Sequence, residues 1–472
     1  MTTLPTNRLA SRSAVTRRIV AHEWQLLRRD KTLVLVGILL AAAIGYAFMN
    51  GGSWRSTRLA DVETIAGNAA DALAANRAAA EADERRSLPQ NVVVLPPGPL
   101  SDFAIGQSDL YPYQARISAF PRADTIFQRY QLDSPTSLLA GRFDLAFVVV
   151  FLLPLVIIAL TFNMLSGERE GGTLALAMAQ AVDLRTLTAG KVLLRLAVVL
   201  GTTFVLCLAG FLLSGLGEGP RLGRFLLWST VVAAYALFWF GLSVAVGARG
   251  KRSETNAAIL VCLWLGLVLI LPGLLNVVVR SIQPVPTRLE YLSAMREASN
   301  EAAKDGAKIL AAFYHEHPEL ASEEQQGGFV PRYFAQQRKV EALLMPILED
   351  LENQLAGQQK LVERLSFVSP AVLVQESMNS IAGSDLGRQQ RYAREARQYL
   401  GDWQEFLEPF IFRGEQLAPA DYDALPVFDF KEEPLSGMTL RIVPSLLGLL
   451  LPALVLGLWG WSRLPRYQLV GH

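Results

Sequence analysis

Residues 166–174 (SGEREGGTL) hold the most informative group of polar and flexible residues in this chain of 472 residues. A charged trio precedes paired glycines there: Glu168, Arg169, Glu170, Gly171 and Gly172. Glycine permits a sharp turn at low steric cost, so the pattern predicts a chain that turns and begins a short helix. Residues 173–179 are apolar although charge flanks them, which indicates docking onto another protein. The alternative is a solvated turn at a membrane edge.

The chain lacks the sequence patterns of common catalytic sites. No G-x-x-x-x-G-K-[ST] phosphate cradle occurs, and residues 247–251 (GARGK) lack its spacing. Neither G-x-S-x-G nor H-E-x-x-H is present. His315 and His317 are two residues apart, so on a helix they point apart, which favours a solvated pair over a metal site. We expect no catalytic residue, no metal, no cofactor and no nucleic-acid partner, and therefore no enzyme in this chain alone.

Six long apolar runs, none with an acidic residue at its centre, must position the 166–174 loop. A helix rises about 1.5 Å per residue, so about 20 apolar residues cross a hydrocarbon core about 30 Å thick. The runs predict an all-α membrane protein with six transmembrane helices and two mainly helical extracytoplasmic insertions. The predicted segments are an interfacial helix at 1–32, spans at 33–49, 144–165, 191–213, 225–248, 256–279 and 440–462, insertions at 50–143 and 280–439, a cytoplasmic loop at 166–190 and a tail at 463–472.

Basic residues near the span ends predict the orientation. They precede the first span, follow the fourth and follow the sixth, with Arg221 and Arg224 as an exception on the opposite side. We therefore expect a multi-pass protein of the bacterial inner membrane with both termini in the cytoplasm. Arg195, one turn past Lys191, is expected to snorkel to the cytoplasmic surface.

Residues 13–31 predict an amphipathic helix before the first span. At 100° per residue, Trp24 and several aliphatic residues fall on one half, and four arginines cluster on the other: Arg17, Arg18, Arg28 and Arg29. We expect this helix to lie along the membrane surface, with its arginines toward anionic lipid headgroups. A soluble helix packed on another domain is the alternative.

The insertions are predicted from composition and periodicity. Residues 57–86 predict a helix, the proline-rich 88–100 is expected to break regular structure, and 102–136 is expected to form a small packed domain. The second insertion predicts helices at 287–315, 332–365 and 385–412 and an irregular segment at 417–434. Prolines within the spans (Pro154, Pro272, Pro444 and Pro452) either kink helices at a gate or shape packing.

The sequence resembles a known family over its six-span frame. Residues 167–174, with 180–182 (QAV) and Gly190-Lys191, look like the signature loop of ABC-2 type permeases, the membrane subunits of ABC transporters. Residues 369–383 resemble external segments of the subgroup with two large periplasmic insertions, similar to nitrous-oxide-reductase maturation and gliding-type permeases. Members of this family often have proline after the glutamine, where this chain has Ala181.

The resemblance implies a function and partners. In the family this loop contains a coupling helix that docks on a cytoplasmic ATPase; the matching residues here are Glu168, Arg169, Glu170, Gly172, Thr173, Leu174 and Leu176, with the last three residue side chains lining the docked face. The implied partners are a cytoplasmic ABC ATPase dimer, which binds ATP and Mg, a second permease subunit (in a homodimer or a related heterodimer), membrane lipids and a periplasmic protein.

Two functions remain open at this stage. The chain is expected to be the permease subunit of an ATP-driven exporter of an amphipathic or hydrophobic substrate. The alternative is a mechanotransmitter, which passes ATPase motion to a periplasmic partner without moving cargo. A membrane-anchored scaffold without an ATPase is a third class, and it predicts that changes at Glu168 and Thr173 leave activity intact.

Overall fold

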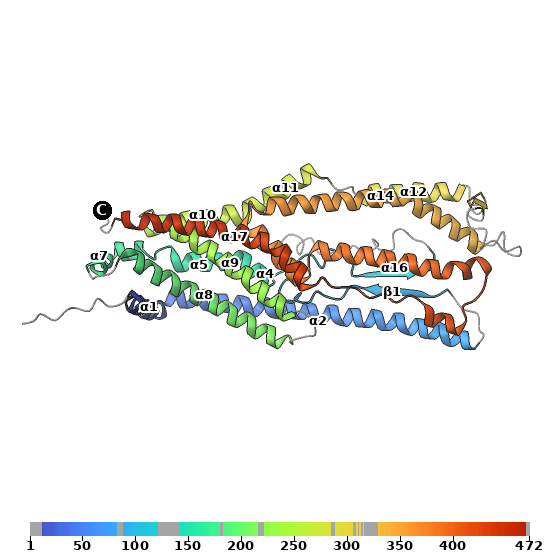
Figure 1. Cartoon of the computed structure of the whole chain (residues 1–472), viewed down its shortest axis with the longest axis horizontal. Helices are drawn as coiled ribbons and strands as arrows, with labels where there is room; N and C mark the ends of the chain where they lie inside the picture. The colour runs from blue at the N-terminus through green and yellow to red at the C-terminus, as the bar shows by residue number, and fades with distance from the viewer. Residues whose placement is uncertain are drawn as a thin grey trace, which may run out of the picture.

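A computed structural model describes residues 12–82, 88–120, 142–179, 183–215, 221–284, 288–304, 308–309, 311–312, 315 and 329–468. Figure 1 shows an elongated molecule with helix α1 and the C-terminal end at the same end. The fold is mostly helical (80%) with six candidate membrane-spanning helices, which confirms the predicted fold class. Residues 1–11, 121–136, 180–182, 316–317 and 469–472, which belong to predicted segments, lie outside the described residues.

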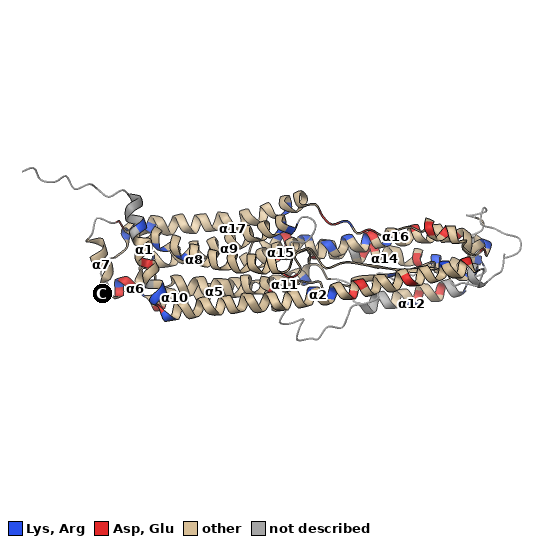
Figure 2. Cartoon of the chain, turned by 90° about the horizontal axis from the view of Figure 1, so that it is seen from below, with Lys and Arg blue, Asp and Glu red and all other residues tan. Residues whose placement is uncertain are grey.

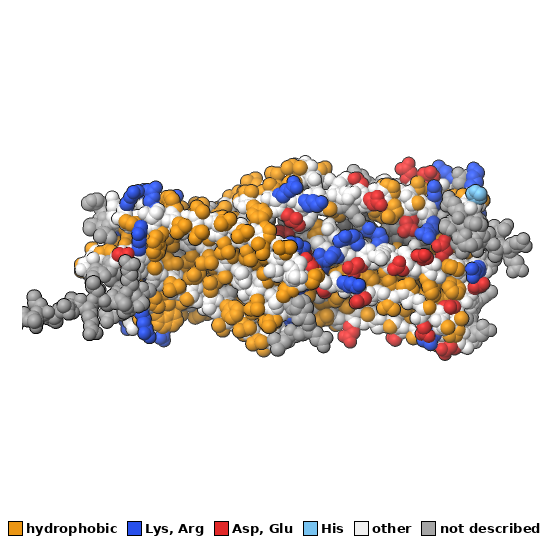
Figure 3. Space-filling view, viewed as in Figure 1, with side chains coloured by type: hydrophobic (Ala, Val, Ile, Leu, Met, Phe, Trp, Pro, Cys, Tyr) orange, Lys and Arg blue, Asp and Glu red, His pale blue; other side chains and the backbone are white. Residues whose placement is uncertain are grey.

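Six helical stretches are long and apolar enough to cross a membrane. They are Lys31–Glu81 (α2), Leu145–Glu170 (α4, η1, α5 and α6), Leu184–Leu213 (α8), Arg221–Gly247 (α9), Ser253–Ile282 (α10, η2 and α11) and Leu435–Arg466 (α17 and η5). Figures 2 and 3 show that one half of the rod is almost free of charge, with Lys and Arg gathered at both of its ends. Of the two ends of this half, we call the one with α1 and the C-terminus the basic end, and the one that meets the insertions the insertion end.

The second and fourth stretches form the centre of the six-helix bundle. In the apolar window of α9, 72% of residues are buried, against 11% in the fifth and sixth stretches. Glycine allows α17 to pack closely on this centre, because a Cβ on Gly241 would lie 2.6 Å from the carbonyl oxygen of Ala453. The outward faces of the other helices are therefore left for lipid or a partner.

Two of the spans contain π-helical turns just before a proline. Val148–Leu152 (η1) precedes Leu153–Thr161 (α5), which has Pro154 at its second position. Leu265–Ile270 (η2) precedes Leu271–Ile282 (α11), which has Pro272 at its second position. Proline lacks an N–H and clashes with the preceding turn, so the helix widens there and a carbonyl loses its backbone partner.

Side chains from other elements bind carbonyls at both widened turns. The hydroxyl of Tyr235 on α9 donates to the carbonyl oxygen of Val150 at 3.0 Å. The hydroxyl of Ser369 donates to the carbonyl oxygen of Leu267 at 3.0 Å. The predicted irregularity at Pro154 and Pro272 is thus localised and hydrogen-bonded.

The insertion half is built around α2, which continues without interruption from the first span to Glu81. Strands Gln90–Val94 (β1) and Gln114–Ser118 (β2) pair antiparallel beside it. The prediction that 88–100 lacks regular structure is therefore wrong at β1. Proline is tolerated at strand edges, and here Pro89 and Pro96 only flank the strand.

The second insertion supplies long helices, as predicted. Arg288–Lys304 (α12), Phe329–Ser366 (α14), Pro370–Ala382 (α15) and Leu386–Arg413 (α16) follow one another, and a 3₁₀ turn at Pro419–Ala424 (η4) lies in the segment that returns to α17. Tyr392, Trp403 and Phe412 of α16 are buried with Val93 and Ile117 of the hairpin. This second core holds the insertion half together.

Helix α15 lies against the spans although it belongs to the second insertion. Besides the bond from Ser369 to Leu267 in η2, a Cβ on Gly448 of α17 would lie 2.9 Å from the side chains of Leu373 and Phe367. Met378 and Ile381 are fully buried in the same core as the spans. Helix α15 thus anchors the second insertion to the six-helix bundle, at the insertion end of the bundle.

Candidate functional site

The loop after the second span forms two short helices at the basic end. Ser166–Glu170 (α6) ends at Gly171, and Thr173–Met178 (α7) begins after Gly172, which has φ +70°. Only glycine adopts this left-handed conformation without steric cost, so Gly172 makes the predicted turn. Asp183 then caps α8, because its carboxylate accepts from the N–H of Thr186 at 3.3 Å.

A buried network of charged side chains binds this loop to α8 and α1. Lys191 of α8 is 2% exposed, and its ammonium donates to carboxylate oxygens of Glu168 at 2.6 Å and of Glu23 on α1 (Arg12–Arg29). Arg195 donates to the carbonyl oxygen of Leu160 at 2.5 Å and lies 3.4 Å from the second carboxylate oxygen of Glu23. Two acids and two bases thus join α1, α6 and α8 through buried contacts.

Arg195 does not snorkel to the surface, so that prediction is wrong. Its guanidinium is 9% exposed and is held by Glu23 and the end of α5. The sequence contained a signal for this, because Glu23 shares a helical face with Ile19, Val20 and Leu27. A carboxylate on an otherwise apolar face needs a buried cation.

The other two charges of the trio bind the loop between the fourth and fifth spans. Arg169 donates to the carbonyl oxygens of Gly250 at 2.5 Å and Lys251 at 3.0 Å, and its guanidinium lies 5.4 Å from the ring of Tyr467. Glu170 accepts from the backbone N–H of Ser253 at 2.7 Å and from its hydroxyl at 2.8 Å. The trio therefore fixes the position of the turn within this chain.

The predicted docking residues divide into an inward and an outward group. Leu174 is fully buried with Leu165, Leu187 and Leu464, so the prediction that it lines a docked face is wrong. Leu176, by contrast, is 71% exposed, and Thr173 is exposed while its hydroxyl donates to the carbonyl oxygen of Glu168 at 3.2 Å.

Helix α1 packs on α8 beside the charge network. A Cβ on Gly190 would lie 2.8 Å from the side chain of Ile19, so glycine there permits the close approach. Arg17, Arg28 and Arg29 are exposed, and Trp24 is 44% exposed with Arg28 5.9 Å from its ring. The side chain of Arg18 lies outside the described residues. The role of these residues at a membrane surface stays a prediction.

Two comparisons with known proteins give partial matches. Residues 288–431, which include α12 to α16, match a family model described as Domain of unknown function (DUF3526). The probable ABC transporter permease protein NosY of Stutzerimonas stutzeri is 30% identical over 131 residues, which are 26% of this chain and 46% of that protein. The match thus spans about half the length of this relative. This distant similarity agrees with the resemblance to ABC permeases carried by residues 167–174.

A second polar junction, which the sequence did not reveal, joins the spans to the insertions. Arg221 at the start of α9 donates to the carbonyl oxygen of Pro99 and to the carboxylate of Asp102, both at 2.8 Å. One turn later, Arg224 donates to the carbonyl oxygen of Ile381 at 3.0 Å. These two arginines, exceptions to the predicted charge distribution, are buried because both insertions cover them.

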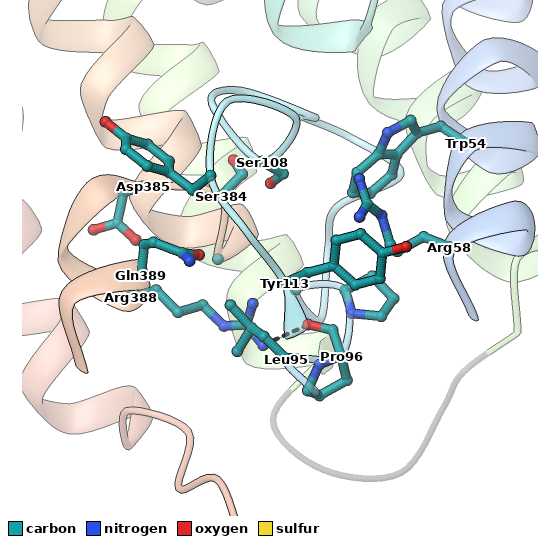
Figure 4. Close-up of a pocket in the computed structure, with 14 residues that line it drawn as sticks. Trp54, Arg58, Leu95, Pro96, Ser108, Tyr113, Ser384, Asp385, Arg388 and Gln389 are labelled. Atoms are coloured by element: carbon teal, nitrogen blue, oxygen red, sulfur yellow. Dashed lines mark hydrogen bonds between the residues drawn. The ribbon is translucent and has the colours of Figure 1, made fainter. Parts of the chain in front are cut away.

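Figure 4 shows the layer just beyond this junction. Arg388 of α16 donates to the carbonyl oxygen of Pro96 at 3.0 Å and pairs with Glu432. On the side of α2, the guanidinium of Arg58 lies 3.8 Å from the ring of Tyr113. Charged side chains from α2 and α16 therefore hold the β-hairpin between them.

Among the described residues, no group of three or more His, Cys, Asp or Glu side chains could hold a metal ion. The described chemistry at both ends of the bundle is therefore that of ion pairs and hydrogen bonds between helices.

Proposed function

We propose that this chain is the membrane-spanning permease subunit of an ABC transporter, driven by a separate cytoplasmic ATPase that docks on α7. The observation that carries the proposal is the construction of the 166–178 turn. Its outer face exposes Thr173 and Leu176, while the trio behind that face is bound to three other parts of the chain. The partial similarity to a permease supports the same assignment.

A push on α7 would reach several spans through specific contacts. Glu168 leads to Lys191 on α8 and thereby to α1, whereas Arg169 and Glu170 lead to the start of α10. Because interfaces packed in this way switch between discrete arrangements, a small displacement of the turn shifts whole helices. The proposed cargo is amphipathic or hydrophobic, since the bundle half carries almost no charge between its ends (Figure 2).

The proposed assembly has two such subunits and an ATPase dimer, which binds ATP and Mg. Symmetric dimers are the commonest closed assembly, and a related second permease is compatible with it. Both α1 and η5 lie at the basic end, which supports a cytoplasmic location of both termini in a bacterial inner membrane (Figure 1).

The test is a binding and hydrolysis assay with the ATPase that co-purifies with this chain from native membranes. Leu176→Asp should abolish ATPase binding, because a charge would replace the most exposed apolar side chain of α7. Val427→Asp, at an apolar position of the insertion half that is even more exposed (88%), is the control and should bind normally. Equal binding by both variants would contradict the proposed docking surface.

Mechanotransmission is a second candidate, which the polar junction at the insertion end favours. Arg221 and Arg224 tie the central helix α9 directly to both insertions, so movement of α9 must move the insertion half. Liposomes that contain the permease and its ATPase separate the two functions. ATP-dependent uptake or release of an amphipathic dye supports export. An ATP-dependent conformational change in the insertion half without dye movement supports transmission to a periplasmic protein.

A further inference from the structure

A large slot lies in the insertion half, far from the loop that the proposed function uses. Its volume is about 740 Å³, within the range of about 300–1,000 Å³ usual for sites that bind small molecules. One wall is the face of α2 that carries Ala66, Ala70, Leu73 and Ala74. The face from Ala66 to Arg77 is about 16 Å long, since a helix rises about 1.5 Å per residue.

The opposite wall comes from three other segments of the chain. It consists of residues 91–94 and 96 at β1, Trp403 of α16, and residues 422, 423 and 425–430, and it is mostly aliphatic and aromatic. Figure 1 shows α2 running past β1 toward the far tip of the rod. Ala66 is 17 residues beyond Met49, so the slot begins about 25 Å outside the predicted first span.

Helix α2 is held on both sides of this slot. Toward the spans, Trp54 and Arg58 donate to the carboxylate of Asp109 at 2.8 and 3.0 Å. Toward the tip, Arg77 binds Asp423 through two hydrogen bonds of 2.6 and 3.1 Å. Between these fixed points α2 presents alanines to the opposite wall. The slot therefore stays open because α2 is fixed on both sides of it and the alanine side chains are too small to fill it.

The side chain of Asn91, which is polar and lies on the opposite wall, already has its partners. Asn91 donates to the hydroxyl of Tyr399 at 2.8 Å, and that hydroxyl donates to the carbonyl oxygen of Pro426 at 2.9 Å. The side-chain oxygen of Asn91 also accepts from the backbone N–H of Val92 at 2.8 Å. These bonds fix residues 425–430 against β1, so the slot is preformed.

The same bonds select the chemistry of the occupant. An extended peptide that added to the edge of β1 would need the N–H of Val92, which Asn91 occupies. A hydrocarbon chain needs no hydrogen bond and gains free energy from contact with the alanine, valine, proline and phenylalanine side chains. The ion pair of Arg77 and Asp423 borders the slot and is partly exposed. A polar headgroup beside this pair would therefore remain in water.

We propose that the slot between α2 and residues 425–430 binds one hydrocarbon chain of an amphipathic molecule, whose headgroup stays outside. The site concerns binding by the insertion half alone. It therefore holds whether or not α7 docks an ATPase.

The experiment uses the full chain in phosphatidylcholine nanodiscs and two photoreactive probes. One arm adds a diazirine-bearing palmitic acid from solution, and the other builds a diazirine-bearing phosphatidylcholine into the nanodisc. Crosslinked peptides are then mapped by mass spectrometry. We expect labelling of peptides that contain residues 66–77 or 422–430. The arm that labels them identifies the source of the chain as free amphiphile or membrane lipid.

Substitutions on α2 provide the matched control. Ala70→Trp fills the slot and should abolish the labelling, whereas Ala72→Trp places the same bulk on the opposite, exposed face and should leave it unchanged. Ala66→Trp is a second filling variant if Ala70→Trp does not fold, as judged by its melting temperature. Labelling confined to the spans in both arms, or equal labelling of the filled and control variants, would overturn the proposal.

Discussion

Lys191 on α8 binds Glu23 on α1 and Glu168 on α6, so one buried ammonium joins two segments separated by more than a hundred residues. Breaking a buried pair leaves an uncompensated charge, which costs about 3–5 kcal/mol. Lys191→Met should therefore lower the free energy of unfolding by about that amount. Thermal unfolding in nanodiscs measures it.

The control for this prediction is Arg28→Met, which removes an exposed cation from α1 and should change stability little. Glu168→Gln combined with Lys191→Met should recover part of the lost stability, because Glu168 loses its ammonium partner in the single variant whereas Glu23 keeps Arg195. A loss at Arg28 as large as at Lys191 would show that the network contributes nothing specific.

Gly172→Ala should destabilise the turn by about 1–2 kcal/mol, because φ is +70° there and an added Cβ is strained in this conformation. No atom lies within 4 Å of the added Cβ, so strain is the whole effect. Gly37→Ala is the matched control: its Cβ also meets no atom within 4 Å, but the helical backbone of α2 should make the change neutral or stabilising. Melting temperatures of the two variants should move in opposite directions.

Ser369→Ala should cost about 1–3 kcal/mol, because the partly buried carbonyl oxygen of Leu267 loses its donor and the N–H of Val372 loses its cap. Ser281→Ala is a suitable comparison, since its exposed hydroxyl bonds only within its own helix. The prediction fails if unfolding of the two variants occurs at the same temperature.

Tyr235→Phe should behave in the same way at the other widened turn. It keeps the ring but removes the donor to the carbonyl oxygen of Val150, and we expect a loss of about 1–3 kcal/mol. Tyr46→Phe, on an exposed face of α2, should be close to neutral. Equal melting temperatures would mean that η1 does not depend on this bond.

Glu376 of α15 should make stability depend on pH. Burial, with the charge of Asp385 next in importance and that of Glu363 adding to it, raises the pKa of this carboxyl from 4.5 to about 7. The folded chain therefore binds the proton more tightly than the unfolded chain, and stability falls as pH rises from 4.5 to about 7.

Glu376→Gln removes this titration, so the difference in melting temperature between pH 5 and pH 8 should shrink. Glu405→Gln, on the exposed face of α16, should leave the difference unchanged. An unaltered pH profile in the Glu376 variant would contradict the assignment.

The spans and long helices could be predicted from sequence because their signals are local. Apolar length identified the six spans, and Gly171 and Gly172 correctly marked the turn before α7. Glu23 on an apolar face indicated a buried cation, but its pairing with Lys191 and Arg195 and the burial of Leu174 could not be derived, because each depends on a distant segment. A charge reads as solvated until the helix that covers it is known.

The insertions show the same division. Helices α12, α14 and α16 correspond to the predicted helices, whereas α15 was not predicted, and β1 was missed because its prolines dominate the local pattern. The contact of α15 with the spans was missed because an amphipathic segment between two insertion helices gives no indication of depth. The structure reveals it through the bond from Ser369 to Leu267 and the packing of Leu373 against Gly448.

The uninterrupted path of α2 from Lys31 to Glu81 gives the molecule a rigid lever. About 47 Å of it extends beyond Asn50, so a tilt of about 6° at the membrane would swing the far tip sideways by about 5 Å. A modest rearrangement beside α1 would thus be amplified into a stroke large enough to reshape whatever meets the tip.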